Sequence, residues 1–223
     1  MNYMISWGGG VNSTAIIALH LLGKLKGKPE IVFADTGCEY PKTYEYINVV
    51  GNTLAKDGWK ITVLRPYTHP EYYAPEIQGK YTNVYDYLWD KKYIPTHRYK
   101  ACNSRFKNTP LTKYAKGRKY MIGICGDELN RIKQNNNIIY PLKDYTRDGC
   151  AWLIGKAGLP IPHKTGCYFC YANKKKEWIY LKNNYPDLWK KSIALENNSK
   201  ATFGTLPLQD KMNNWKDLLE KGE

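Results

Sequence analysis

Three consecutive glycines, Gly8 to Gly10, separate a short apolar segment from the long apolar run over residues 15–22. Glycine lets the backbone turn its N–H groups toward a ligand, and the N-terminus of a helix adds partial positive charge. We therefore predict a strand ending at Ser6, a phosphate-binding loop, and a helix over residues 12–22 capped by Asn12 or Ser13. An ordinary tight turn is the alternative, but it needs fewer glycines.

Apolar, β-branched runs recur at residues 30–34, 60–64 and 120–124, and a helical stretch covers residues 41–56. Apolar strands separated by helices are typical of a parallel sheet that is buried on both faces. We predict an α/β fold with a doubly wound, mostly parallel sheet. Ligands of such folds bind beyond the carboxyl ends of the strands. We therefore expect the glycine loop, Asp35-Thr36-Gly37 and Gly126-Asp127-Glu128 to meet at one edge.

The character of the sequence changes near residue 141, where it becomes rich in Cys, Pro, Lys and Trp and shows no further clear strand. We predict a nucleotide-binding α/β domain over residues 1–140 and a Cys-rich, mainly helical region over residues 141–223, ending in a polar helix from residue 213. No apolar run is long enough to span a membrane, and no signal pattern is present at the N-terminus. We therefore expect a cytoplasmic protein.

The formal net charge is +14, which makes a polyanionic partner such as nucleic acid plausible. Many of the 20 tyrosines could stack on bases. A compositional bias toward lysine explains the charge equally well, because the lysines are scattered and the one tight run is at residues 174–176. Both interpretations stay open at this point.

Six cysteines in a cytoplasmic chain favour metal or redox roles over disulfides. Cys167 and Cys170 form a Cys-x-x-Cys motif whose two thiolates can reach one soft cation. Cys150 is expected to open a helix, whose dipole would lower the pKa of the thiol, and Cys102 supplies a fourth ligand. Four thiolates can hold either zinc or a 4Fe-4S cluster, and the spacing does not separate them. We expect Cys38 and Cys125 to be buried and apolar, with Cys125 a minor candidate for carrying sulfur.

Four segments resemble, in order, the motifs of the PP-loop ATP pyrophosphatases and the phosphoadenylylsulfate (PAPS) reductase family. The glycine segment is similar to Ser-Gly-Gly-x-Asp-Ser, with Gly8 and Asn12 in place of the usual Ser and Asp. The other three segments are residues 35–43, residues 102–111 and residues 123–131, and the resemblance covers residues 5–208. It is greatest to the short PAPS-reductase-like proteins of phages and prokaryotes.

This resemblance implies an enzyme that binds ATP with Mg²⁺ and adenylates an acceptor for sulfur transfer. It favours a 4Fe-4S cluster, with zinc as the alternative, and it implies a protein that donates sulfur. The basic charge of the chain then favours a nucleic-acid acceptor such as tRNA or DNA. The implied nucleotide-binding residues are Ser6, Gly8, Gly9, Gly10, Asn12, Ser13, Thr14, Asp35, Thr36 and Gly37. The implied catalytic residues are Arg105, Lys107, Asp127, Glu128 and Arg131, and the implied metal ligands are Cys102, Cys150, Cys167 and Cys170.

Two other functions remain. A sulfonucleotide reductase uses a thiol nucleophile from a C-terminal Glu-Cys-Gly-Leu-His segment, whereas no cysteine follows Cys170 in this sequence. A non-catalytic nucleotide-binding module would fit the replacement of the usual Ser and Asp by Gly8 and Asn12.

Overall fold

Within residues 3–220, which the computed structural model describes, five parallel strands form one sheet in the order β3-β2-β1-β4-β5. The strands are β1 (Met4–Ser6), β2 (Glu30–Ala34), β3 (Ile61–Leu64), β4 (Tyr120–Met121) and β5 (Ile138–Ile139). The helices are α1 (Val11–Leu21), α2 (Pro41–Lys56), α3 (Val84–Lys91), α4 (Ala101–Asn103), α5 (Thr109–Ala115), α6 (Arg147–Lys156), α7 (Lys175–Asn184), α8 (Pro186–Ser199) and α9 (Leu208–Glu220), and shorter helical turns are η1 (Pro70–Tyr72), η2 (Ser104–Asn108) and η3 (Gly126–Arg131). The predicted parallel α/β fold is confirmed.

The central strand β1 pairs with β2 on one side and with β4 on the other, so that Met4 lies between Glu30 and Tyr120. The chain runs from β1 outward to β3 and then returns to the other side of β1. The strand order therefore reverses beside the carboxyl end of β1, which is where open α/β sheets bind ligands. The glycine loop begins at this end, directly after Ser6.

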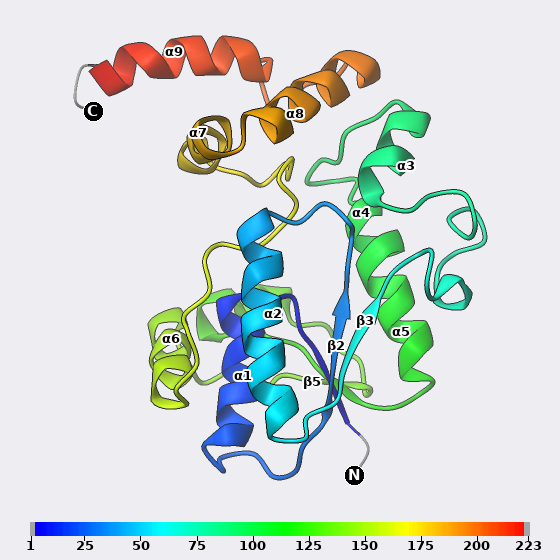
Figure 1. Cartoon of the computed structure of the whole chain (residues 1–223), viewed down its shortest axis with the longest axis vertical. Coiled ribbons are helices and arrows are strands. Elements are labelled where there is room, and N and C mark those ends of the chain that lie inside the picture. Colours follow the sequence, from blue (N-terminus) through cyan, green and yellow to red (C-terminus); the bar gives the residue numbers. More distant parts are fainter. Residues whose placement is uncertain (1–2, 221–223) are drawn as a thin grey trace.

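Helices cover both faces of the sheet, as the continuous apolar strands require (Figure 1). On one face, Ile5, Ile31 and Phe33 pack in a core cluster with residues of α1, α2 and α6. On the other face, Met4 and Val32 pack in a cluster with residues of α5. Alternate residues of a strand point to opposite faces, which explains why neighbours such as Met4 and Ile5 enter different clusters.

Two local predictions differ from the structure, and one strand was missed. Helix α1 begins at Val11 with the extended residue Gly10 as its N-cap, so the predicted caps Asn12 and Ser13 are wrong. The fourth strand ends at Met121 instead of residue 124, because Gly123 lies against the backbone at the start of α1. Strand β5 was not predicted, since a two-residue strand shows no periodicity.

The predicted helical C-terminal region is confirmed: α7, α8 and α9 lie beyond the carboxyl edge of the sheet (Figure 1). A second aromatic core joins this region to α3, and it includes Trp178, Trp189 and Phe203. The polar terminal helix expected from residue 213 corresponds to α9, which starts at Leu208, and residues 221–223 lie outside the described residues. The division at residue 140 stays a prediction, and α6, which follows it, packs on α1. No helix in the described part of the chain combines the length and the apolar character that a membrane crossing requires.

Candidate functional site

The glycine loop leaves a group of backbone donors at the start of α1. Gly9 has a φ of +70°, a conformation that glycine adopts without strain. The Ser13 hydroxyl accepts a hydrogen bond of 3.2 Å from the Gly8 N–H and donates one of 3.2 Å to the Gly10 carbonyl. The first intrahelical bond runs from the Thr14 N–H to the Gly10 carbonyl, at 3.0 Å. The N–H groups of the first three helical residues therefore have no intrahelical acceptor, which is the arrangement that binds anions.

The hydroxyl of Thr14 stabilises the loop from inside, because it accepts a hydrogen bond of 2.9 Å from the Trp7 indole. Both side chains are buried. Ser13 and Thr14, which were predicted to bind nucleotide, thus fix the loop conformation through their side chains. Ser6 ends β1 opposite Val32 and sets where the loop begins.

The loop after β4 meets the glycine loop, as predicted. The amide nitrogen of Asn12 donates to Oε2 of Glu128 at 3.0 Å and to the Cys125 sulfur at 3.4 Å. A Cβ on Gly123 would lie 2.6 Å from the Ser13 backbone nitrogen, so only glycine allows this approach. Asn12 is 9% exposed, and within residues 3–220 its Oδ1 has no hydrogen-bond partner.

The three charged residues of η3 have different surroundings. Glu128 faces Asn12 and pairs with Arg131 at 2.5 Å. Asp127 turns away, because its Oδ2 accepts a hydrogen bond of 2.6 Å from the Arg147 N–H at the start of α6. Of the two predicted carboxylates, Glu128 is therefore the one that contacts a glycine-loop residue.

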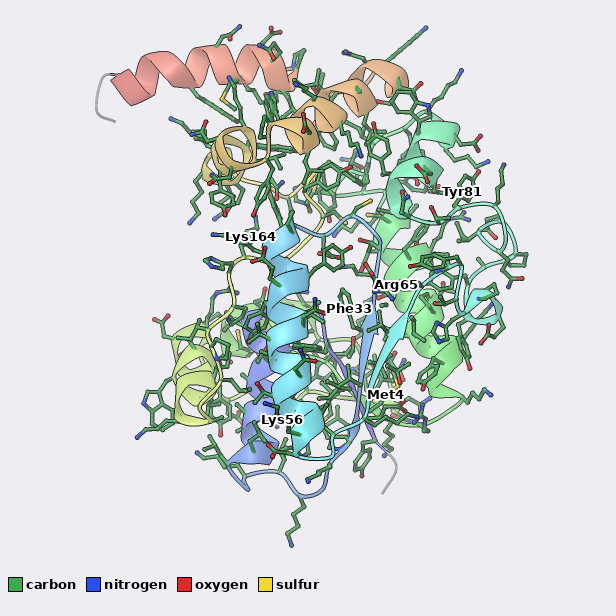
Figure 2. All side chains as sticks on the ribbon, viewed as in Figure 1. Met4, Phe33, Lys56, Arg65, Tyr81 and Lys164 are labelled. Atoms are coloured by element: carbon green, nitrogen blue, oxygen red, sulfur yellow. The ribbon has the colours of Figure 1, made fainter. Side chains whose placement is uncertain are left out.

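The Asp35 carboxylate is buried and is bonded to its own surroundings. Its Oδ1 accepts hydrogen bonds of 2.8 Å from both the Gly37 N–H and the Tyr44 hydroxyl. Its Oδ2 accepts one of 2.9 Å from Nε of Arg65, the residue that follows β3 (Figure 2). Burial, together with the Asp35 charge, raises the pKa of Tyr44 well above its ordinary value. Arg65 was not predicted, and its position directly after a strand was the available signal.

Lys107 and Arg105 point to different carboxylates. Nζ of Lys107 lies 2.9 Å from Oε1 of Glu39, whose side chain is 1% exposed. Within residues 3–220 the other oxygen of Glu39 has no partner. Arg105 forms an ion pair with Glu76 and lies over the Tyr87 ring. The predicted basic pair is therefore divided, and Lys107 is the member that faces the cysteine-containing segment.

We call residues 166–170 the cysteine loop. It pairs with the segment after β2 through an isolated antiparallel bridge between Glu39 and Cys167. The Tyr168 N–H donates to the Cys38 carbonyl at 3.0 Å, and the Tyr40 N–H donates to the Gly166 carbonyl at 3.2 Å. The Thr36 hydroxyl also lies 3.3 Å from the Cys167 sulfur. These contacts hold the loop that carries two predicted metal ligands against a predicted nucleotide-binding segment.

Three of the four predicted cysteine ligands share one neighbourhood around Lys107. Burial raises the pKa of Cys102 to about 11, and it also raises the pKa values of Cys167 and Cys170 above the ordinary range of a thiol. The Lys107 ammonium acts in the opposite direction on all three. These partly exposed cysteines are therefore thiols that a bound cation would convert to thiolates.

Cys150 lies elsewhere, in the core formed with α1 and close to Cys125. It is completely buried, and burial raises its pKa to about 12, so the predicted lowering of this pKa at the start of α6 is wrong. Desolvation of the thiolate outweighs the helix dipole here. The structure does not bring Cys150 to the other three ligands. Among the side chains that the structure describes, no three of Cys, His, Asp or Glu are arranged to hold one metal ion.

A model of the phosphoadenosine phosphosulfate reductase domain matches residues 2–156, which include the glycine loop, Asp35, Lys107 and Glu128. The chain belongs to this family. Two uncharacterised proteins are similar to this chain. MJ0973 of Methanocaldococcus jannaschii is 28% identical over 86% of this chain. The nin region protein ORF290 of Escherichia phage lambda is 31% identical over 75% of this chain. The chain spans 47% of the first relative and 64% of the second.

Two solved structures align with this chain. The PAPS reductase from Candida auris, solved as a phosphate complex, superposes on 76% of this chain and 83% of its own with a TM-score of 0.52 and 13% identity. This likeness shows a shared fold. The U34-tRNA thiolase NcsA from Methanococcus maripaludis, with its 4Fe-4S cluster, covers 92% of this chain and 74% of its own at a TM-score of 0.44 and 13% identity.

Proposed function

We propose that this chain is a PP-loop ATP pyrophosphatase-type enzyme that adenylates a nucleic acid and prepares it for sulfur transfer. An acceptor oxygen would attack the α-phosphorus of ATP, the bond to pyrophosphate would break, and AMP would stay on the acceptor. A hydrosulfide-type nucleophile would then attack the acceptor carbon. AMP would leave with the oxygen, so that a carbon–sulfur bond replaces the carbon–oxygen bond.

The observation that carries this proposal is the set of N–H groups at the start of α1 that have no intrahelical acceptor. They suit the oxygens of a pyrophosphate, because a helix N-terminus combines donors with positive potential. Glu128 lies beside them through Asn12 and would be the carboxylate that holds Mg²⁺ between phosphates, as hard oxygen ligands do. Asp127 is bonded to the N-terminus of α6 and would act from a greater distance.

The three basic residues would neutralise charge that develops on phosphate oxygens. Arg131 is the best placed, because it already pairs with Glu128 beside the glycine loop. Lys107 and Arg105 are paired with Glu39 and Glu76, and each would have to exchange that carboxylate for a phosphate. Asp35 and Thr36 would lie beside the nucleoside, with Asp35 holding Gly37 in place.

An iron–sulfur cluster remains part of the proposal on the chemistry of the cysteine loop. Cys102, Cys167 and Cys170 are partly exposed soft ligands that share the neighbourhood of Lys107, and they would have to move closer together to hold a cluster or zinc. The set of four does not fit, since Cys150 lies in the core beside Cys125. A bound cluster would supply a binding site for sulfur from a donor protein.

Conversion of ATP to AMP and pyrophosphate, followed with and without added tRNA or DNA, tests this function. We expect AMP to form and its rate to rise with the acceptor. Absence of AMP under both conditions would leave a non-catalytic nucleotide-binding module. Release of sulfite from a sulfated adenine nucleotide in the presence of a thiol, without AMP formation from ATP, would favour a sulfonucleotide reductase instead.

A further inference from the structure

A pocket of about 240 Å³ lies between the start of α2, the segment before the cysteine loop, and α7. No residue in its lining was predicted from the sequence to be functional. Its lining includes three lysines, a histidine and two tyrosines: Lys42, Lys164, Lys176, His163, Tyr40 and Tyr180. Such a volume suits a single planar group and is too small for a double helix.

The pocket has an excess of positive charge. Its one carboxylate, Glu177, accepts a hydrogen bond of 2.6 Å from the Lys174 N–H and lies 3.4 Å from Nζ of Lys164. Within the described residues, no carboxylate is at ion-pair distance from Lys42 or Lys176. Two ammonium groups are therefore left to attract an anion.

Aromatic rings lie next to these charges. The centroids of Tyr40 and Tyr180 are 6.4 Å apart, and Tyr185 lies within 6.3 Å of the first and 6.0 Å of the second. Nζ of Lys42 lies 5.6 Å from the centroid of the Tyr180 ring, and Tyr180 is partly exposed. Because the Lys42 ammonium lies over one face of the Tyr180 ring, a base would stack on the other face while Lys42 holds the adjoining phosphate.

The pocket adjoins the glycine loop through one residue. His163 and Lys164 precede Thr165, whose hydroxyl lies 2.9 Å from where a Cβ on Gly10 would be. Figure 2 shows Lys164 beside the N-terminal end of α2, whereas Lys56 lies at the other end of the same helix. A ligand in the pocket would therefore be held close to the proposed site of phosphate chemistry.

We propose that this pocket binds one nucleotide of a single-stranded nucleic acid, with the base against Tyr180 and the phosphate beside Lys42 and Lys176. This inference rests on the proposed function, which says how the strand is modified. It adds that the strand binds in this pocket and that it binds as a single strand. Enzymes that modify a base require it unstacked, which agrees with a pocket of this size.

Binding of a fluorescently labelled single strand of about 12 nucleotides to the full chain, measured by anisotropy without ATP, tests the inference. Stacking on an aromatic side chain contributes about 1–3 kcal/mol, so Tyr180→Ala should weaken binding by about 5- to 150-fold. Lys42→Ala and Lys176→Ala should each weaken it several-fold and reduce the salt dependence by about one phosphate contact. Lys56→Ala is the matched control and should leave the affinity unchanged.

Equal losses for Lys42→Ala and Lys56→Ala, an unchanged affinity of Tyr180→Ala, or a duplex that competes as well as the single strand would each overturn the inference. Formation of AMP from ATP by the unaltered chain is measured separately. If the strand binds in a way that depends on the pocket but no AMP forms, the proposed function is refuted and this inference stands. If AMP forms but strand binding does not depend on the pocket, this inference is refuted and the proposed function stands.

Discussion

Asn12 donates a hydrogen bond of 3.0 Å to Oε2 of Glu128, although 116 positions separate them in the sequence. The bond joins the loops that follow β1 and β4 at the point where the strand order reverses. An amide can donate to a carboxylate, whereas the aspartate usual at this position of the PP-loop motif cannot when it is ionised. Asn12 therefore allows a carboxylate to lie beside the glycine loop without a bound cation.

Asn12→Asp should place two carboxylates together and remove a hydrogen bond to a charged acceptor. We expect the free energy of unfolding at neutral pH to fall by about 1–3 kcal/mol, since Asn12 is nearly buried. Mg²⁺ should restore part of this loss because it would bind between the carboxylates. Urea unfolding with and without Mg²⁺ measures both effects, and Asn12→Asp combined with Glu128→Gln is the control. Equal stability of Asn12→Asp and the unaltered chain would contradict the role of this bond.

Gly123→Ala should destabilise the fold, because its Cβ would lie 2.6 Å from the Ser13 nitrogen and 2.7 Å from the Asn12 carbonyl carbon. Forced displacement of packed backbone costs about 1–3 kcal/mol, and it should also weaken ATP binding by moving the start of α1. Thermal unfolding and nucleotide titration measure the two results.

Gly155→Ala is the matched control for that substitution. Gly155 lies in α6, and a Cβ there meets nothing within 4 Å. Replacement of a helical glycine by alanine should raise stability by about 0.5–1 kcal/mol. A similar loss in both variants would show that the close approach of Gly123 to α1 is unimportant.

Glu30, at the start of β2, should contribute stability that is lost in acid. Burial opposes its ionisation, but the hydrogen bonds from Lys60, Tyr114 and Arg118 prevail and lower its pKa from 4.5 to about 2. A lowered carboxylate pKa stabilises the fold above the unfolded value, and this contribution disappears as the pH falls from about 4.5 to about 2.

Glu30→Gln should therefore lower the free energy of unfolding by about 1–2 kcal/mol at neutral pH, after allowance for solvent screening at the exposed Lys60. Near pH 2 the variant and the unaltered chain should be equally stable. Urea unfolding across this pH range measures the difference. Glu71→Gln, on an exposed turn, should change stability little at every pH. A difference for Glu30→Gln that persists unchanged into acid would contradict the assignment.

Serine at Cys102, Cys167 or Cys170 should each reduce the iron content of protein purified without oxygen, as measured by an iron assay and the visible spectrum. Cys150→Ala should keep its iron, because Cys150 lies in the core with Cys125. Loss of iron from Cys150→Ala with the fold intact would show that the cysteine loop moves to form a four-cysteine site. If the purified protein is colourless and contains zinc, the proposed metal at these cysteines is zinc and not iron.

Strands β1 to β4, the glycine loop and helix α2 were predictable because each depends on a local pattern of apolar residues, glycine or proline. The meeting of Asn12 with Glu128 followed from the rule that parallel strands end at one edge. Other features depend on packing between distant segments. Burial of Cys150 follows from the contact of α6 with α1, and the separation of Arg105 from Lys107 follows from their carboxylate partners Glu76 and Glu39.

Thr165 lies against Gly10, and Cys167, two positions later, is bridged to Glu39. The Gly166 carbonyl accepts a hydrogen bond from the Tyr40 N–H, so the backbone between these two contacts is restrained. A ligand on the glycine loop that displaces Thr165 must therefore shift Cys167 as well. Energetic coupling of this kind is reciprocal. If a bound nucleotide changes the affinity of the cysteine loop for its ligand by a certain factor, that ligand changes the affinity for the nucleotide by the same factor. The two sites would then communicate through three residues of backbone.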